Sequence, residues 1–172
     1  MFELDGYQSL SKDELYQTLQ RQARALLAGE SDPIANAANL SALLWYALPE
    51  VNWVGFYILR GEELVLGPFQ GKPACVRISL GRGVCGTAAA QRSVQVVPDV
   101  QDFPGHIACD ADSRSEIVFP LVVGDSLWGV LDVDSPVPGR FDEDDRRGLE
   151  QLVEVFMRGT RLATPEVGGP AS

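Results

Sequence analysis

The spacing of apolar residues changes twice along the 172-residue chain, and these changes limit the folds it can adopt. Two N-terminal segments have apolar residues at helical spacing, short β-forming segments follow, and helical spacing returns near the C-terminus. Two helices, then five or six strands mostly joined by hairpins, then a helix predict an α+β layer fold. We expect one antiparallel sheet with helices on one face and long loops on the other, where a concave site could form.

The predicted helices begin at capping residues. Ser11 and Glu14 form the pattern of a capping box before the first helix. Asp32 and Pro33 supply an N-cap and a proline at the first helical position of the second helix. The last helix opens at residues 141–143, where acidic side chains suit the positive end of the helix dipole.

Six segments have the composition of strands, and turn residues separate most of them. They are residues 53–59, 63–66, 74–80, 94–97, 116–123 and 126–134. A short helical segment is expected at 86–91 and a long loop at 98–114. We expect residues 1–162 to form one domain and residues 163–172, rich in Pro, Gly and small side chains, to be a disordered tail.

Charge and hydropathy exclude several classes of protein. The net charge of −10 repels nucleic-acid phosphates and anionic membrane surfaces, so we expect neither partner. No apolar run approaches the ~20 residues of a membrane span. The N-terminus lacks the basic start and apolar core of a signal peptide, which favours a cytoplasmic location where thiols stay reduced.

Residues 81–86 match the pattern G-x-G-x-x-G after a predicted strand. A dinucleotide-binding fingerprint needs a βαβ unit of about 30 residues, and the predicted helix here is too short for a parallel crossover. The alternative is a tight turn whose glycines allow positive φ and close approach of the backbone. Such a turn could still present N–H groups to a carboxylate.

The chain has three cysteines, Cys75 on a predicted strand, Cys85 in the glycine-rich loop and Cys109 in the long loop. With His106 they could form a zinc site, although their spacings are unlike those of most structural zinc sites. Cys75 and Cys85 could equally be inert core thiols. Cys109 is different, because a loop thiol beside a histidine can have a lowered pKa, and further thiols are available to resolve an oxidised state as a disulfide.

Acidic and aromatic side chains supply the other candidates. Asp132 and Asp134 alternate on one face of a predicted strand, about 7 Å apart, and Glu116 opens its hairpin partner. They are either solvated strand-end acids or a cluster that binds a cation or donates a proton. Trp53 and Tyr57 share one face of another strand, as core residues or as an aromatic wall of a site.

Together these segments resemble a known family, the free methionine-(R)-sulfoxide reductases, which are stand-alone GAF-domain enzymes. The resemblance extends from about residue 8 to residue 160, and the three-cysteine set distinguishes it from ordinary GAF sensor domains. The motifs that carry it lie at residues 52–57, 81–88, 106–110, 113–116 and 131–135. The resemblance implies a GAF fold, with a central antiparallel sheet of about six strands flanked by helices.

The resemblance also implies roles for the cysteines. Cys109 would attack the sulfur of free methionine (R)-sulfoxide and become a sulfenic acid, and Cys75 would resolve it as a disulfide with Cys109. Cys85 would be a third thiol near the pocket, with a less settled part in catalysis. Thioredoxin would return the electrons, and no metal or bound cofactor is expected. Members of the family commonly form homodimers, so a homodimer is an expectation here too.

The remaining residues would bind the substrate. Glu116, Asp132 and Asp134 would surround it as the acidic group, one of them donating the proton, and Trp53 and Tyr57 would line the pocket wall. The competing interpretation is a GAF module that binds a ligand, or senses redox state through its cysteines, without turnover. Formation of methionine separates the two.

Overall fold

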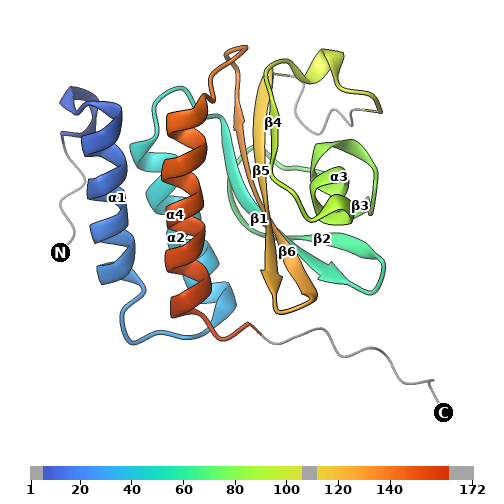
Figure 1. Ribbon diagram of the computed structural model, residues 1–172, viewed down its shortest axis with the longest axis horizontal. Coiled ribbons are helices and arrows are strands. Elements are labelled where there is room, and N and C mark those ends of the chain that lie inside the picture. Colours follow the sequence, from blue (N-terminus) through green and yellow to red (C-terminus); the bar gives the residue numbers. More distant parts are fainter. Residues whose placement is uncertain (1–5, 106–111, 163–172) are drawn as a thin grey trace.

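A six-stranded antiparallel sheet divides the molecule into two sides (Figure 1). The computed structural model describes residues 6–105 and 112–162. The strand order is β3-β2-β1-β6-β5-β4. The strands are β1 (Trp53–Arg60), β2 (Glu63–Gly71), β3 (Arg77–Ser79), β4 (Gln95–Val97), β5 (Ser115–Val123) and β6 (Ser126–Ser135). The helices are α1 (Lys12–Leu26), α2 (Pro33–Ala47), α3 (Gly83–Gln91) and α4 (Glu143–Gly159), with 3-10 turns η1 (Tyr7–Ser9) and η2 (Val100–Asp102).

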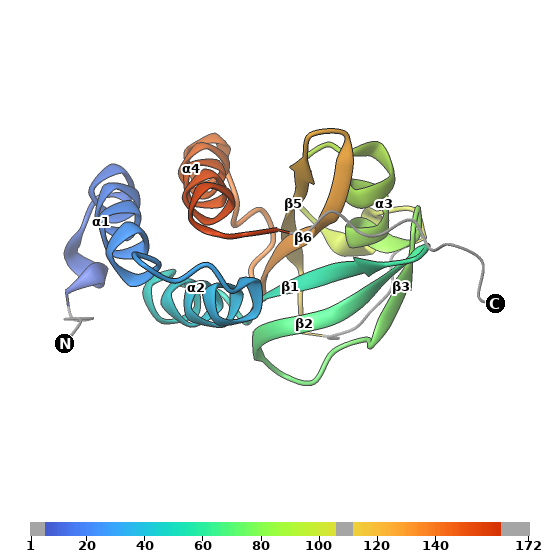
Figure 2. The same cartoon turned by 90° about the horizontal axis from the view of Figure 1, so that it is seen from below.

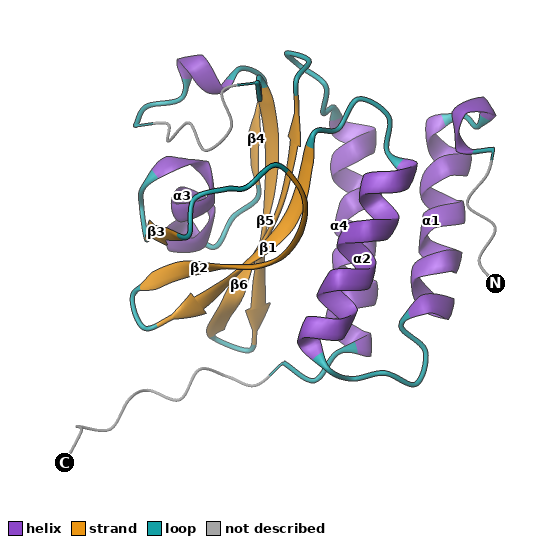
Figure 3. Ribbon diagram, turned by 180° about the vertical axis from the view of Figure 1, so that it is seen from behind, coloured by secondary structure: helices purple, strands orange, loops and turns teal. Residues whose placement is uncertain are grey.

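The long helices and the short helix lie on opposite sides of the sheet (Figures 2 and 3). Helices α1, α2 and α4 form a layer on one side, and α3 lies on the other with the long loops. The predicted α+β architecture with an antiparallel sheet of about six strands is confirmed. One addition to the expectation is that α3 shares the loop side, where it begins directly beside the sheet.

The alternation of β1 separates two apolar cores. Val54, Phe56 and Ile58 point into the core shared with the three long helices. Trp53 and Tyr57 point to the opposite side, into a second cluster that contains Cys85 of α3. Because side chains alternate along a strand, one strand supplies a structural core on one side and a different environment on the other.

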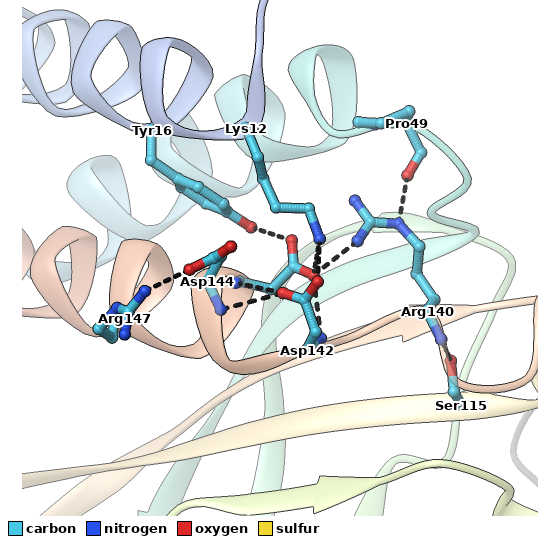
Figure 4. Close-up of polar contacts among 9 residues, drawn as sticks. Lys12, Tyr16, Pro49, Ser115, Arg140, Asp142, Asp144 and Arg147 are labelled. Atoms are coloured by element: carbon cyan, nitrogen blue, oxygen red, sulfur yellow. Dashed lines mark hydrogen bonds and ion pairs between the residues drawn. The ribbon is translucent and has the colours of Figure 1, made fainter.

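A buried ion-pair network fastens α1 to the start of α4 (Figure 4). Asp145 is fully buried and its carboxylate accepts hydrogen bonds from Tyr16 at 2.8 Å, Lys12 at 2.8 Å and Arg140 at 3.0 Å. Arg140 also reaches the carbonyl of Pro49, so the network ties the loop after α2 to the same point. Both predicted caps of the first two helices are present, at Ser11 and at Asp32.

The predicted strand at residues 74–80 is too long, and the placement of Cys75 on it is wrong. β3 begins only at Arg77, and Cys75 lies in the connection from β2. Pro73 has no backbone N–H to donate to a strand ladder. The carbonyl oxygen of Cys75 accepts a hydrogen bond from the side-chain hydroxyl of Tyr57 rather than from the backbone of a neighbouring strand. β2 is correspondingly longer than predicted and continues to Gly71.

The glycine-rich segment begins as a tight turn, as the second interpretation of its motif predicts, and continues as the first turn of α3. Gly81 and Gly83 have φ of 79° and 61°, in the region where side chains are disfavoured. A Cβ at Gly86 would lie 2.4 Å from the carbonyl oxygen of Ser79, so only glycine lets α3 approach β3 this closely. α3 starts three residues earlier than predicted, which brings Cys85 into its first turn.

The helices of the described chain have at most 17 residues, whereas a membrane-spanning helix needs about 20. None of them, within residues 6–105 and 112–162, combines the length and the apolar composition needed to cross a membrane.

Candidate active site

Three neighbouring strands bring the predicted acids and aromatic residues to one pocket. In the ladder between β1 and β6, Trp53 lies opposite Asp134, and in the ladder between β5 and β6, Glu116 lies opposite the same residue. Asp132 lies two residues before Asp134 on β6, on the same face, as the alternation predicts. All of these residues line a pocket with Tyr57, Cys85 and the segment before β3.

The centre of the pocket is a buried group of two carboxyls and a thiol. Cys85 Sγ donates to Asp132 Oδ2 at 3.2 Å and lies 3.9 Å from Glu116 Oε1. One thiol and two carboxyl oxygens of these residues lie within 4.8 Å of one another. Glu116 and Asp132 are 7% and 6% exposed, so water screens their charges poorly. They are therefore not the solvated strand-end acids of the alternative interpretation.

Burial raises the pKa of every group in this cluster. For Glu116, burial and the neighbouring Asp132 carboxylate raise the pKa well above its ordinary range. Burial raises the pKa of Asp132 to about 7, although hydrogen bonds from Cys85 and Glu116 favour its ionised form. For Cys85, burial and the charge of Asp132 raise the thiol pKa. Near neutral pH the two carboxyls therefore hold at least one proton between them.

An aromatic wall flanks the acids. The rings of Trp53 and Phe69 stack with centroids 5.4 Å apart and an interplanar angle of 14°, and the rings of Trp53 and Tyr57 stack with centroids 5.8 Å apart. Gly55 makes room for this arrangement, since a Cβ there would lie 2.5 Å from the indole of Trp53. Both Trp53 and Tyr57 also belong to the apolar cluster on this side of the sheet, so the core and wall interpretations describe the same residues.

Sequence reasoning missed Ser113 as an individual contributor to the pocket. Its hydroxyl lies 3.4 Å from Asp134 Oδ2 and accepts a hydrogen bond from the side-chain amide of Asn52 at 3.1 Å. This chain of contacts orients Asp134 at the pocket edge. Asn52 and Ser113 both lie in motifs that carry the family resemblance, which was the available signal, but neither has a composition that marks it as functional.

The cysteines fall in different environments. Cys85 is buried in the acid cluster, and Cys75 is half-buried in the connection before β3. Cys109 and His106 lie outside the described residues, so the predicted nucleophile and the predicted pairing of Cys75 with Cys109 stay predictions. The alternative of a zinc site built from all three cysteines and His106 is untested for the same reason.

The acid cluster has the chemistry of a site for one cation. Its carboxyl oxygens and thiol could surround a single positive centre, which could be an ammonium group as well as a metal ion. In the structure a hydrogen bond of 3.2 Å joins the Cys85 thiol to the Asp132 carboxyl. The dinucleotide interpretation of residues 81–86 gains no support, because β3 and β4 lie at opposite edges of an antiparallel sheet.

Comparison with known proteins places this chain in a family. The model of the GAF domain family matches residues 13–158. Free methionine-R-sulfoxide reductase of Escherichia coli (strain K12) is 58% identical to this chain over 144 residues, which are 84% of this chain and 87% of that protein. The protein of the same name from Saccharomyces cerevisiae is 42% identical over 156 residues, covering 86% of this chain and 87% of that protein.

Solved structures agree. fRMsr of Staphylococcus aureus in complex with substrate matches with a TM-score of 0.80 and 51% identity, over 84% of this chain and 94% of that chain. Free methionine-R-sulfoxide reductase from Neisseria meningitidis in complex with its substrate matches with a TM-score of 0.84 and 45% identity, over 87% of this chain and 90% of that chain. Fold, pocket and relatives thus lead to one conclusion: the chain belongs to the GAF-domain family of free methionine-R-sulfoxide reductases.

Proposed function

We propose that this chain reduces free methionine (R)-sulfoxide to methionine, using one carboxylic acid and its cysteines, without a bound cofactor or metal. The observation that supports this most is the proton-holding pair of Glu116 and Asp132, buried beside the aromatic wall. A sulfoxide is reduced only when its oxygen can be protonated, and a carboxyl that keeps its proton near neutral pH is suited to that task.

Glu116 is the proposed proton donor. Burial and the charge of Asp132 raise the pKa of Glu116 well above its ordinary range, whereas the hydrogen bond from Glu116 favours the ionised form of Asp132. The shared proton therefore resides on Glu116 near neutral pH. Donation to the sulfoxide oxygen weakens the S–O bond and makes the sulfur electrophilic.

The other acids are proposed to select the free amino acid. Asp132, with Asp134 at the pocket edge, offers negative charge to the ammonium group of the substrate. In a peptide this nitrogen is a neutral amide, so a buried carboxylate would be left without its ion pair. Trp53 can pack against the S-methyl group, because its indole face lies in the same pocket.

The sulfur chemistry follows the family resemblance. The Cys109 thiolate attacks the sulfoxide sulfur, the protonated oxygen passes to the cysteine as a sulfenic acid, and methionine leaves. Cys75 then forms the disulfide with Cys109 and the oxygen leaves as water. Cys85 is a poor candidate for either thiol, because burial beside two acids raises its pKa and keeps it protonated. We assign it instead the hydrogen bond that orients Asp132.

The electron donor, the cellular location and the oligomeric state complete the proposal. Thioredoxin is the proposed electron donor, since a dithiol is needed to return the proposed Cys75–Cys109 disulfide to two thiols. The proposed location is the cytoplasm, where such thiols stay reduced. A homodimer is the proposed assembly.

An assay with separated substrates tests the function. The protein, thioredoxin, thioredoxin reductase and NADPH are supplied with free R sulfoxide, free S sulfoxide or a peptide-bound sulfoxide, and methionine is quantified. We expect methionine only from the free R form, and none from the Cys109→Ser variant. Turnover of the peptide-bound form, or undiminished turnover by the variant, would contradict the proposal. Binding of free sulfoxide without methionine formation would favour the non-catalytic GAF sensor.

A further inference from the structure

Two side chains of the pocket wall also hold the backbone segment that carries Cys75. The indole N–H of Trp53 donates to the carbonyl oxygen of Lys72 at 3.1 Å. The hydroxyl of Tyr57 donates to the carbonyl oxygen of Cys75 at 2.9 Å. Both donors come from one face of β1, so residues 72–75 are held at both ends by the same strand.

The two donors are themselves firmly placed. Trp53 and Tyr57 are each 2% exposed, and their rings stack with each other at 5.8 Å. Phe69 also stacks on the indole, with ring centroids 5.4 Å apart. Gly71, with φ of 127°, lets the chain pass the indole, because a Cβ there would lie 2.7 Å from Trp53 Cδ1. Because these two side chains cannot move within the packed core, their hydrogen bonds fix the backbone of residues 72–75 relative to the sheet.

The segment itself lies outside the sheet. It leaves β2 after Gly71, and the carbonyl oxygen of Val76 accepts a hydrogen bond from the backbone of Leu66 at 3.0 Å, just before β3 begins. Cys75 therefore sits one residue before the chain rejoins its neighbour. Tyr57 therefore binds the backbone of Cys75, the residue whose sulfur forms the proposed disulfide.

We propose that Tyr57, assisted by Trp53, is a positioning residue for disulfide formation by Cys75. This inference rests on the proposed function, which assigns Cys75 the resolving role. In that step the Cys75 sulfur attacks the sulfur of the Cys109 sulfenic acid. The new S–S bond replaces the S–O bond, and the hydroxyl leaves as water with the thiol proton of Cys75.

The physical reason is the effective concentration of one thiol near the other. A tethered thiol reacts fast when its geometry is already correct, and each added freedom of the segment lowers the rate. Removing the Tyr57 hydroxyl leaves the ring in the wall but frees the Cys75 carbonyl. The loss of one net hydrogen bond corresponds to a change of about fivefold to tenfold.

The test is Tyr57→Phe in a single turnover. The reduced full-length protein is mixed with excess free methionine (R)-sulfoxide and no reductant, and samples are quenched over time. Methionine reports the first step, and a sulfenic-acid probe with mass spectrometry reports the unresolved intermediate. We expect the ratio of the disulfide-forming rate to the methionine-forming rate to fall about fivefold to tenfold, so that sulfenic acid accumulates. An unchanged ratio would overturn the inference.

Two further variants separate positioning from general destabilisation. Tyr16→Phe removes another buried phenol hydrogen bond, to Asp145 on the opposite side of the sheet, and should leave the ratio unchanged. Trp53→Phe removes the bond to Lys72 and should lower the ratio, by less than Tyr57→Phe because Lys72 is farther from the thiol. A fall of the same size in Tyr16→Phe would contradict a specific role for Tyr57.

The stability of the disulfide can be measured without any turnover of substrate. Equilibration with glutathione and glutathione disulfide gives the equilibrium constant for the Cys75–Cys109 disulfide, and we expect Tyr57→Phe to lower it about fivefold or more. Absence of methionine from the wild-type protein would refute the proposed function, whereas this constant would still decide the positioning role. A constant equal to that of the wild type would refute the positioning role alone.

Discussion

Buried carboxyls lie on both sides of the sheet, Asp145 on one side and Glu116 with Asp132 on the other, and they differ in what surrounds them. On the side of the long helices, Asp145 accepts hydrogen bonds from two cations, Lys12 and Arg140, and from the hydroxyl of Tyr16 (Figure 4). Its side chain is fully buried, and that of Arg140 is 7% exposed. The negative charge is therefore compensated within the fold.

On the loop side, Glu116 and Asp132 have no such compensation. In the part of the chain that the structure describes, neither forms an ion pair with a lysine or arginine, and the Cys85 thiol lies 3.2 Å from Asp132 Oδ2 and 3.9 Å from Glu116 Oε1. Burial raises the pKa of both carboxyls, so protons take the place of cations.

The comparison shows how to tell a structural acid from a functional one. A buried charge that the fold neutralises contributes to one arrangement of helices. Buried acids that the fold leaves without a cation are poised to exchange a proton or to bind a positive group from outside. Both sides contain a buried aspartate, and only the surroundings of Asp145 and Asp132 separate the two.

The largest effect is expected where compensation is complete. Asp145→Asn should lower the free energy of unfolding by about 3 to 5 kcal/mol, because it leaves the cation of Arg140 buried without its partner. Urea denaturation measures this change. The control is Asp144→Asn at the exposed ion pair with Arg147, which should cost less than about 1 kcal/mol. Equal effects of the two substitutions would show that burial does not distinguish them.

The second prediction concerns the pH dependence of stability. A carboxyl whose pKa is raised in the folded state keeps a proton that the unfolded chain releases, so raising the pH favours unfolding. For Asp132, with a pKa raised to about 7 by burial, the window extends upward from the ordinary value of 3.8. Stability relative to Asp132→Asn should fall with rising pH in this window, by about 1.4 kcal/mol per pH unit at most.

On the side of the long helices, the pH dependence of stability should have the opposite sign. A hydrogen bond from Lys12 holds the pKa of Asp142 below its ordinary value, so its contribution is present above that value and is lost as the pH falls through the lowered pKa. Denaturation of the wild type, Asp132→Asn and Asp142→Asn at several pH values measures both. A parallel pH dependence of the wild type and Asp132→Asn would contradict the raised pKa.

The most specific effect is expected on catalysis. Glu116→Gln should lower kcat/KM for free methionine (R)-sulfoxide about 100-fold, equivalent to about 2.7 kcal/mol, because the amide cannot donate a proton as the acid does. The unfolding free energy should stay the same or rise, since an uncompensated acid is removed. A loss of activity below about threefold would assign proton donation to another group.

Local patterns predicted most of the fold. The capping residues before α1 and α2, the β5–β6 hairpin across Gly124 and the shared face of Asp132 and Asp134 depend on neighbours within a few residues. Each is decided by short-range geometry, so the sequence contains the whole cause. The strand expected at 74–80 is present only at 77–79, and the carbonyl oxygen of Cys75 is bound instead by the side chain of Tyr57, which is distant in the chain.

The site was predicted only as a set of residue types. The motifs named Glu116, Asp132 and Trp53, but their joint placement depends on the ladders that β6 forms with β1 and β5. The orientation of Asp134 by Ser113 and the hydrogen bond from Tyr57 to Cys75 have no local pattern. Contacts between residues that are distant in the chain leave no periodic pattern in the amino-acid sequence, so a single sequence does not reveal them.

By itself the sequence determined the element types, the alternation of each strand and, through its motifs, the family to which the chain belongs. Only the tertiary structure decided that Asp145 meets cations while Glu116 and Asp132 meet a thiol, and that Cys75 lies beside the sheet rather than in it. The physical reason is that pairing and desolvation depend on what surrounds a group in space, whereas secondary structure depends largely on its neighbours along the chain.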